Sequence, residues 1–459
     1  MLPAAKPSFG PTASHPPDDL MDTPATAPIS TAEYTPATAS ITGPFRERAA
    51  SVKQSVQRLE SVDLYRGILM VIMLIDHTRD LVHFDGLAGL HDPLDVNSTT
   101  WMLYLTRWIT HLCAPGFVFL AGVSAGLQRQ RGTSAPALSR FLWTRGLALI
   151  LIELVVVRMV TSFNVDLKFF GNLQVIWAIG VSMIALAALV HLSDRVILAS
   201  GLLIVCGHNV LDRITVPVWK GPADPTPPFG DKLWILLHQG GFFPLYGTNG
   251  PVVRVHYAVL PWIGLMAVGF VFANVWTMEA ERRQRLLRQM GLALVAAFIT
   301  LRLTHLYGDN IAWHAQETFA KTVGSFMNVQ KYPPSLLFLL ATLAPCVLGL
   351  SFLDGRRLTA PLARVLITYG RVPMFYYLLQ WTWAWVCGVL ITTGAGLPLA
   401  PYFAPRAGGF YGGPPPMLGG TLAHVYLCWL LGVVVLYFPC RWYAGVKARR
   451  KDLVLLRYL

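Results

Sequence analysis

Residues 61–80 read Ser61-Val-Asp-Leu-Tyr-Arg66-Gly-Ile-Leu-Met-Val-Ile-Met-Leu-Ile-Asp76-His77-Thr-Arg79-Asp80, an apolar segment with ionisable side chains toward both ends. Eleven helical steps of about 100° bring His77 back to within roughly 20° of Arg66, and the helical rise separates the two by ~16 Å. One face of the predicted helix therefore carries the Arg66 cation near its start and the His77 imidazole near its end. Charged groups are costly in hydrocarbon, so these side chains are expected to line a polar cavity.

The composition is that of a polytopic membrane protein. The 459 residues are 54% hydrophobic and only 13% charged, against about 25% charged in ordinary soluble domains. The net charge of +13 does not indicate a nucleic-acid partner, because the basic residues fall in short clusters between apolar runs. The cysteines lack CxxC spacing, so we predict neither a metal site nor a disulfide framework and expect buried thiols. They are Cys113, Cys206, Cys346, Cys387, Cys428 and Cys440.

Three regions follow from composition. Residues 1–57 are rich in Pro, Ala, Thr and Ser and are predicted to be a disordered cytoplasmic tail. Residues 58–445 form the predicted transmembrane domain, and 446–459 a basic cytoplasmic C-terminal segment. The predicted fold is an all-α bundle of about ten transmembrane helices with both termini in the cytoplasm. The expected spans lie near 64–83, 108–128, 138–159, 173–192, 195–212, 256–277, 290–308, 333–353, 372–392 and 421–441.

The orientation rests on the basic clusters, all of which fall on one side of these spans. They contain Arg46, Arg48, Lys53 and Arg58, then Arg129, Arg131 and Arg140, then Arg282, Arg283, Arg285 and Arg288, then Arg356, Arg357 and Arg364, and finally Lys447, Arg449, Arg450 and Lys451. The positive-inside rule makes this side the cytoplasm. The long loops near 84–107, 213–255, 309–332 and 393–420 are then outside. An eleventh, re-entrant piece at 234–243 is an alternative to the count of ten.

Polar residues gather in the predicted outer half of the membrane. The outer part of the first span contains Asp76, His77, Asp80 and His83. The outer half of the second span contains His111. Pro115 and Gly116 are expected to weaken the helix just below His111. Further members of the same layer are Arg79, Arg158, Asp166, His208, Asp212, Arg302, His305 and Asp309. The cavity should open outward.

Arginines gather in the predicted cytoplasmic half. They are Arg66, Arg140, Arg145 and Arg371. Arginine forks suit phosphate groups, so a ligand with phosphates inside and a reactive arm reaching His77 would fit the helical offset. The alternative for Arg140 and Arg145 is a purely topogenic role.

His77 is the leading candidate for general acid–base chemistry. Asp76 beside it, or Asp80 one turn away, can hold one ring nitrogen and leave the other as a base. The alternative is that Asp76, Arg79 and Asp80 form an ion-pair network that only locks the helix. His111 has an equally simple role as a structural hydrogen-bonding group. Gly122 and Gly126 form a small-xxx-small pair, which predicts close helix packing.

Several of these residues resemble a known family. Leu59-Glu-Ser-Val-Asp63-Leu-Tyr-Arg66-Gly67 with Asp76-His77, followed by Phe117-Val-Phe-Leu-Ala-Gly122-Val-Ser124, resembles the catalytic domain of heparan-alpha-glucosaminide N-acetyltransferase and its bacterial relatives. Gly370-Arg371-Val-Pro-Met-Phe-Tyr-Tyr-Leu-Leu-Gln380 resembles a further block of the bacterial members. The expected resemblance runs from about residue 58 to the end.

The resemblance implies transfer of an acyl group, with acetyl preferred, from cytoplasmic acyl-coenzyme A to a hydroxyl or amine on a glycan at the outer face. His77 would be the general base or a transient acyl carrier. Arg145 matches a cytoplasmic arginine motif placed near coenzyme A, although the second arginine of that motif is replaced by Ala148. The lysosomal member uses a histidine in the following loop, where His83 and His91 are the nearest equivalents.

The expected setting is a bacterial inner membrane, with lipid and the acceptor as partners, no metal, and a homodimer left open. The alternative function is a transporter or flippase for a small anionic or glycan-linked solute. Such proteins often contain inverted repeats, and the Asp-His-x-Arg-Asp string occurs once in this sequence.

Overall fold

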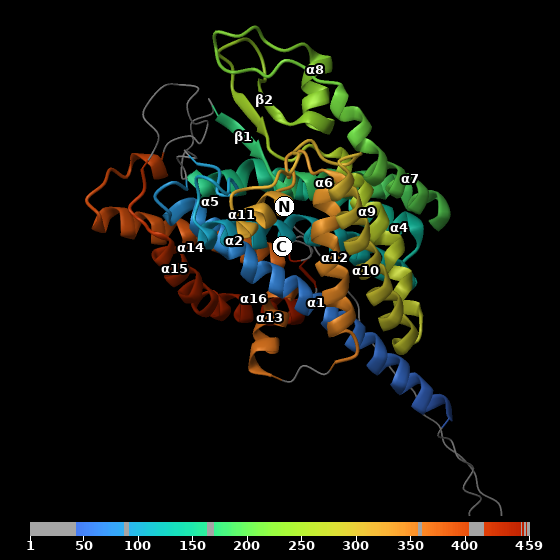
Figure 1. The fold of residues 1–459 in the computed structure, drawn as a ribbon. Coiled ribbons are helices and arrows are strands. Elements are labelled where there is room, and N and C mark those ends of the chain that lie inside the picture. The colour runs from blue at the N-terminus through green and yellow to red at the C-terminus, as the bar shows by residue number, and fades with distance from the viewer. Residues whose placement is uncertain are drawn as a thin grey trace, which may run out of the picture. The chain divides into compact units, whose positions relative to one another are not determined.

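The protein is mostly helical, with 71% of residues in helices. The computed structural model describes residues 43–86, 91–162, 169–356, 360–403, 417–450, 452–453 and 456. The helices are α1 Gly43–Val82, α2 Trp101–Ile109, α3 Cys113–Gln130, α4 Ala135–Leu151, α5 Arg158–Ser162, α6 Val175–Leu189, α7 Asp194–Gly207, α8 Phe229–Trp234, α9 Leu260–Phe272, α10 Ala280–Thr304, α11 Phe319–Met327, α12 Leu336–Leu353, α13 Pro361–Arg371, α14 Pro373–Gly394, α15 Leu422–Val435 and α16 Tyr437–Arg449 (Figure 1).

Short helical turns of other types extend several of these helices. They are η1 Thr110–Leu112, η2 Ile152–Val157, η3 His208–Arg213, η4 Ile235–Gln239, η5 Ala273–Thr277 and η6 Ala400–Tyr402. By its internal contacts the chain divides into residues 1–51 and 52–459. The site lies in the second unit.

Within the described residues, seven helical stretches are long and apolar enough to cross a membrane. They are Trp101–Gln130, Asp194–Arg213, Leu260–Thr277, Ala280–Thr304, Leu336–Leu353, Pro373–Gly394 and Leu422–Arg449. The remaining three predicted spans are also helical, in α1, in α4 with η2 and α5, and in α6. α1 carries several charges among its apolar residues, and α6 has only 15 residues. An integral membrane protein is thus supported, whereas the count of ten and the side of each terminus stay predictions.

α1 runs antiparallel to the stretch formed by α2, η1 and α3. Arg66 near one end of the pair bonds Ser124, whereas Asp76 at the other bonds Arg107. Between them the Cys113 thiol donates to the Leu69 carbonyl at 3.5 Å. This ladder fixes the relative height of residues on the two helices.

The helical irregularity in this stretch falls at His111 itself. We expected it just below, at Pro115 and Gly116, but both residues lie in the first turn of α3. Proline has no N–H, so Pro115 cannot donate to the carbonyl four residues earlier, which belongs to His111. The turn Thr110–Leu112 is accordingly a 3₁₀ turn.

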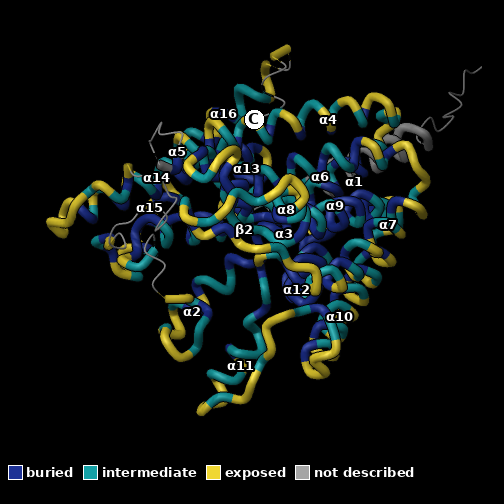
Figure 2. The backbone as a smooth tube through the Cα atoms, turned by 90° about the horizontal axis from the view of Figure 1, so that it is seen from above, coloured by how far each residue is buried: buried dark blue, intermediate teal, exposed yellow. Residues whose placement is uncertain are grey.

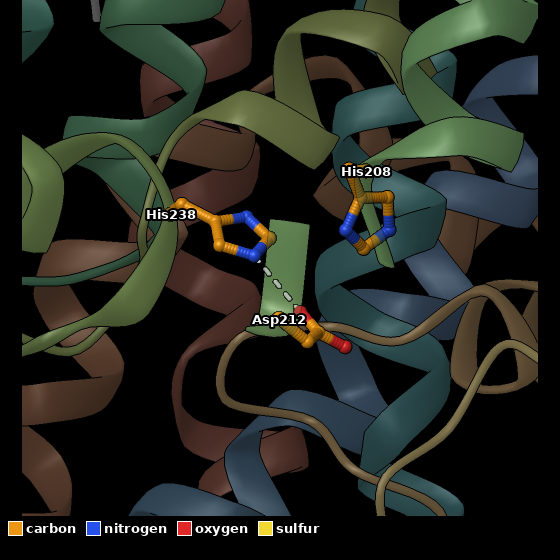
Figure 3. Close-up of side chains that lie close together, drawn as sticks. All are labelled: His208, Asp212 and His238. Carbon is orange, nitrogen blue, oxygen red and sulfur yellow. Dashed lines mark hydrogen bonds and ion pairs between the residues drawn. The ribbon is translucent and has the colours of Figure 1, made fainter. Parts of the chain in front are cut away.

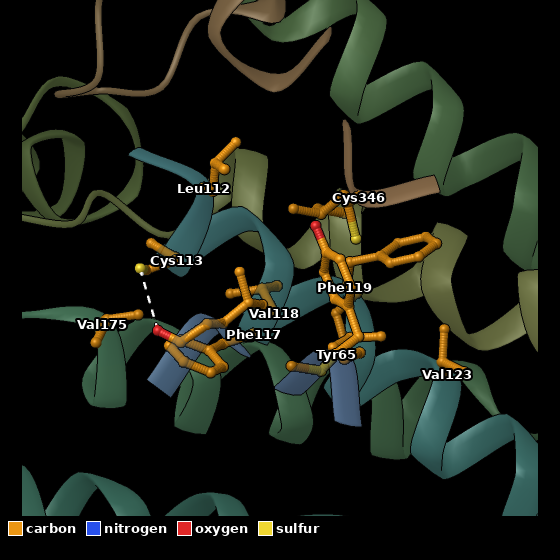
Figure 4. Packing of buried hydrophobic residues seen from close by; sticks show 14 of the residues in the cluster. Tyr65, Leu112, Cys113, Phe117, Val118, Phe119, Val123, Val175 and Cys346 are labelled. Atoms are coloured by element: carbon orange, nitrogen blue, oxygen red, sulfur yellow. Dashed lines mark hydrogen bonds between the residues drawn. The ribbon is translucent and has the colours of Figure 1, made fainter. Parts of the chain in front are cut away.

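The core is centred on α3 and its neighbours. Figure 2 shows buried backbone concentrated around α3, α9 and α12. Side chains from α1, α3, α6 and α12 meet there, including Tyr65, Phe119, Val175 and Cys346 (Figure 4).

Close helix packing at Gly122 and Gly126 is confirmed. α3 makes its most extensive contacts with α9, and a side chain on either glycine would collide with backbone carbonyls of α9, at Met266 and Phe270. α1 and α13 approach in the same way, because Gly370 faces the backbone of Asp63.

A small three-stranded sheet was not predicted. β1 Phe169–Leu173 pairs in parallel with β3 Val252–Val255, and β2 Gly241–Pro244 pairs antiparallel with β3. Figure 1 shows β2 and α8 together at one edge of the helical body. The segment 234–243, considered as a re-entrant piece, comprises the end of α8, the turn η4 and part of β2.

The burial of the cysteines agrees with the sequence-based expectation at all positions but one. Five cysteines are buried as expected, but Cys206 is exposed, so the prediction of a buried thiol was wrong there; all six are free. Cys206 lies on the part of α7 that faces outward from the bundle. The expectation failed because an apolar sequence does not distinguish a side chain that faces lipid from one that packs against protein. Asp166, residues 404–416 of the expected 393–420 loop, and residues 1–42 of the expected tail lie outside the described residues.

Candidate functional site

Arg66 is held firmly at one end of the α1–α3 pair. Its Nη1 donates to the Gly370 carbonyl at 2.9 Å and to Asp63 at 3.1 Å, and its Nη2 donates to the Ser124 hydroxyl at 2.8 Å. Charge-assisted bonds of this kind are stronger than neutral ones. The close approach of α1 and α13 at Gly370 is what brings the carbonyl within reach. Arg66 thus ties three helices together.

Other predicted arginines gather at the same end. Arg371 lies 3.8 Å from Asp63 and 3.7 Å from Glu60. Arg145 of α4 interacts electrostatically with Lys447 of α16, which also interacts with Arg66 and Asp63. The helices α1, α13 and α16 therefore bring cations together around the Asp63 carboxylate, and Arg145 of α4 lies near one of them, Lys447. Lys447 was assigned to the C-terminal basic segment by sequence, and its place here was not foreseen.

Arg140 differs from the other predicted arginines in its position. It is exposed on α4, one and a half turns before Arg145. Arg145 is half-buried and carries its guanidinium over the Phe141 ring, 5.9 Å from the centroid. Arg371 is itself half-exposed, so its side chain is accessible to a ligand.

Asp76 is the centre of the polar network at the other end of α1. Arg107 Nη1 donates to both of its carboxylate oxygens at 2.9 Å, and Arg79 donates to it at 3.3 Å. Arg79 also donates to Asp80 at 2.6 Å. The ion-pair network of Asp76, Arg79 and Asp80 that the sequence allowed is therefore present, with Arg107 added to it.

Sequence reasoning missed Arg107 and the residues that join the network from further along the chain. Arg107 could have been found, because it stands four residues before His111 and shares its helix face. Lys331 is buried and interacts electrostatically with Asp76 and His111. Its approach depends on the long connection between α11 and α12, which no local pattern predicts.

His77 packs between aromatic side chains of α14. Its ring stacks on Trp381, with centroids 3.7 Å apart, and meets the edge of Tyr377 at 5.7 Å. His77 and Trp381 are both buried. Gln380, next to Trp381, is fully buried, and neither atom of its amide has a hydrogen-bond partner among the described residues. The contact of Trp381 with His77 joins α14 to α1 and was not predicted from the sequence.

His111, in the turn η1 between α2 and α3, is deeply buried. It is 1% exposed, and neither ring nitrogen has a hydrogen-bond partner within the described part of the chain. Its ring meets the edge of Phe338 at 5.3 Å. The structural role considered for it, as a hydrogen-bonding group between helices, is therefore not the one seen among these residues. An imidazole without a hydrogen bond is available to a ligand.

His83 and His91 lie beyond the end of α1. His83 is buried, forms a bridge with Gly420, and accepts a hydrogen bond at Nδ1 from the Asp85 amide at 3.4 Å. His91 is exposed, with its Nδ1 3.2 Å from Asp85. Asp85 thus links the two histidines that the resemblance offered as alternatives to His77.

The remaining members of the predicted polar layer divide between other roles. Arg302 is buried and donates to carbonyls at the end of α11, at Ser325, Phe326 and Asn328, which is a structural arrangement. His208 and Asp212 form a cluster of their own with His238.

A cavity outside the predicted site lies between α10 and α12. It measures about 630 Å³ and is lined by Glu281, Gln284, Arg285, Arg288, Leu348, Ser351, Phe352, Asp354, Gly355 and Arg356. Its arginines were assigned to topogenic clusters by sequence. They form a second basic site, which can serve as a control in experiments on Arg66.

Comparison with known protein families gives a match over the first part of the membrane domain. Residues 58–308 match the family model described as heparan-alpha-glucosaminide N-acetyltransferase, catalytic. This is more than half of the chain, and it covers Arg66, Asp76, His77 and His111. The match ends before the Gly370–Gln380 block, which was expected to extend the resemblance. None of the proteins with curated descriptions matches this chain.

Proposed function

We propose, since this chain belongs to the heparan-alpha-glucosaminide N-acetyltransferase catalytic family, that it transfers an acetyl group from cytoplasmic acetyl-coenzyme A to an acceptor at the outer face. The family supports a membrane acetyltransferase. The donor, the acceptor and the two faces are our assignment. The acceptor class is a hydroxyl or amine, with a glycan as the preferred carrier.

One observation carries the proposal. A single continuous helix, α1, holds Arg66 in a cationic cluster at one level and His77 ~16 Å further along, as the helical rise requires. The contacts of α1 with the antiparallel stretch place His111 between these levels, because Cys113 lies opposite Leu69 and Arg107 opposite Asp76. The donor can therefore be held at one end and its thioester presented near two buried histidines.

The cationic cluster suits the phosphates of coenzyme A. Arg371 is accessible, and Lys447 of α16 approaches Arg66, Asp63 and also Arg145 of α4. Guanidinium groups bind phosphate oxygens in a fork geometry, and several cations together offset the charge of a nucleotide. Asp63 keeps Arg66 oriented, so the cluster is preorganised before the donor binds.

The transfer step needs a base within reach of the acceptor. The acceptor oxygen or nitrogen attacks the thioester carbonyl carbon, the C–S bond breaks, and the coenzyme A thiolate leaves. His77 takes the acceptor's proton and passes it to the thiolate, so that protons and charge balance. Trp381 holds the imidazole plane by stacking. We assign His111 to bond the acceptor or the carbonyl oxygen, and Asp80 and His83 to the route by which the acceptor enters and leaves.

A second form of the same step places the acetyl group on His77 first. The imidazole nitrogen then attacks the thioester, and the acceptor displaces the histidine in a second step. The two forms differ in one observable, the appearance of label on the protein in the absence of acceptor.

The experiment uses the full chain purified into nanodiscs with radiolabelled acetyl-coenzyme A. We expect release of coenzyme A and transfer of label, lost in His77→Ala and reduced in His111→Ala. His314→Ala is the matched control, because His314 is exposed and its ring makes no hydrogen bond among the described residues. Unchanged turnover in His77→Ala would contradict the assignment. Counterflow of solute in proteoliposomes without any labelled product would instead support a transporter.

The acceptor is best sought in the cell envelope. Mass spectrometry of envelope glycans from a strain lacking this protein should show the loss of one acyl group, restored by the wild-type gene and not by His77→Ala. An unchanged glycan profile would direct the search to small-molecule acceptors.

A further inference from the structure

Two histidines and an aspartate from separate segments converge at the end of α7. His208 and Asp212 belong to the turn η3, and His238 belongs to η4, 26 residues after Asp212 (Figure 3). The His238 Nε2 and Asp212 Oδ1 atoms are 2.8 Å apart, and one ligand atom from each residue lies within 4.8 Å of the others. This cluster takes no part in the proposed acyl transfer.

The carboxylate is held in place by residues that leave one oxygen for the cluster. Asp212 Oδ2 accepts from the Asn209 amide at 2.8 Å and from the Asn310 amide at 2.9 Å. Its Oδ1 faces His238. Such outer hydrogen bonds orient metal-ligating carboxylates in characterised sites. Asn209 is fixed in turn, because its amide oxygen accepts from the Leu336 backbone N–H at 2.9 Å.

The histidines contain buried polar atoms that the protein leaves unsatisfied. His208 is 2% exposed, and neither of its ring nitrogens has a hydrogen-bond partner in the described chain. His238 is equally buried, and its Nδ1 also has none there. A buried polar atom without a partner destabilises the fold, because it has lost its hydrogen bonds to water. Figure 3 shows the two imidazoles on either side of Asp212.

We propose that His208, Asp212 and His238 bind a divalent transition-metal ion of the zinc type. Two neutral imidazoles and one carboxylate are a common ligand set for such ions, with Zn–N and Zn–O distances of about 2.0–2.2 Å. In a tetrahedral site with such bonds the ligand atoms stand about 3.4 Å apart. The His238 Nε2 and Asp212 Oδ1 atoms, 2.8 Å apart, must therefore separate slightly, whereas separations of up to 4.8 Å must shorten. Three protein ligands leave a fourth position for water or a substrate oxygen.

The proton between His238 and Asp212 has somewhere to go when the ion binds. In the metal-free arrangement His238 Nε2–H donates to Asp212 Oδ1. The ion would replace this proton and bind both Nε2 and Oδ1. The imidazole would then carry its single proton on Nδ1, which has no hydrogen-bond partner among the described residues. The proton on Nε2 is released to solvent or moves to Nδ1 according to the starting tautomer. Metal binding therefore competes with protons.

The ion would connect the end of α7 to the region that carries the small sheet. η4 leads from α8 into β2, and Gln239 beside His238 already bonds both backbone groups of Val216. Occupancy is expected to stabilise the fold, because a ligand that binds only the native state adds to its stability.

The test uses the full chain, purified in detergent, stripped with chelator and dialysed against zinc. Metal analysis should give about one zinc per chain, and cobalt should give the visible absorption bands of a four- or five-coordinate site with imidazole ligands. Zinc should raise the melting temperature of the wild-type protein. Binding no greater than that of a His208→Gln/His238→Gln variant would overturn the proposal.

His208→Gln is the most informative single variant. Because the ring of His208 makes no hydrogen bond among the described residues, its replacement by glutamine breaks no side-chain hydrogen bond in that part of the chain. Loss of an outer-sphere partner alone weakens metal sites by about 10–100-fold, so removal of a ligand should weaken zinc binding at least about tenfold. His191→Gln, an exposed histidine outside the cluster, should bind zinc like the wild type. Equal affinity in His208→Gln and His191→Gln would exclude His208 as a ligand.

Discussion

Arg107 Nη1 donates to both carboxylate oxygens of Asp76 at 2.9 Å. The pair joins α2 to α1 at the level of His77, where both side chains are largely removed from solvent. A single nitrogen makes both bonds, so the arrangement depends on a cation at that point and not on the guanidinium fork. This distinction can be tested directly, because lysine supplies one such nitrogen and methionine supplies none.

Arg107→Met should therefore destabilise the protein, whereas Arg107→Lys should retain most of its stability. Removing the cation leaves the Asp76 carboxylate with Arg79 as its remaining hydrogen-bonded cation, and we expect a loss of about 1–3 kcal/mol. The measurement is the melting temperature of the purified protein in detergent. If the two variants melt together, the charge on residue 107 does not hold α2 to α1.

Arg66 offers a test of the donor end. Arg66→Lys keeps the charge but cannot bond Gly370, Asp63 and Ser124 at once, since lysine has one nitrogen for partners on three helices. We expect the KM for acetyl-coenzyme A to rise about tenfold or more, with a smaller rise in Ser124→Ala, which removes one bond.

Arg288→Ala is the control for this prediction. Arg288 lines the second basic cavity, and its loss should leave the KM for acetyl-coenzyme A unchanged. The reverse pattern, with KM altered by Arg288→Ala and not by Arg66→Lys, would move the donor to the cavity between α10 and α12.

The sequence predicted those parts of the site that lie within one helix. Arg66, Asp76 and His77 follow from helical periodicity, and the antiparallel neighbour with His111 follows from alternating spans. Arg107 was overlooked although its spacing to His111 is local. Lys331 and Trp381 could not be predicted in the same way, because their contacts join segments more than two hundred residues apart. The small sheet was missed for a related reason, since its strands are four or five residues long and β1 pairs with β3 across the helices α6, α7 and α8.

Trp381 gives a test of the histidine end. The stack on His77, with centroids 3.7 Å apart, fixes the plane of the imidazole. Trp381→Ala removes that constraint, and because misplacement by about 1 Å can cost ~100-fold in rate, we expect kcat to fall about 10–100-fold. The KM for acetyl-coenzyme A should change little, because the proposed donor site lies at the Arg66 end.

Trp381→Phe provides the conservative comparison. A smaller ring still stacks on His77, so kcat should recover in part. A loss of folded protein in both variants, seen as an aggregated profile in size-exclusion chromatography, would assign Trp381 to packing alone.

The contact between α3 and α9 gives a prediction about stability that is independent of function. Gly122 faces the Met266 carbonyl across the helix pair, and no space exists there for a side chain. Gly122→Leu must push the helices apart, and overpacking of this kind costs about 1–3 kcal/mol or more. Gly394→Ala is the matched control, because Gly394 ends α14 with nothing within 4 Å of an added Cβ. Thermal melting should show a marked decrease for Gly122→Leu and no decrease for Gly394→Ala. A Gly122→Leu protein as stable as the wild type would mean that α3 and α9 do not pack at this distance.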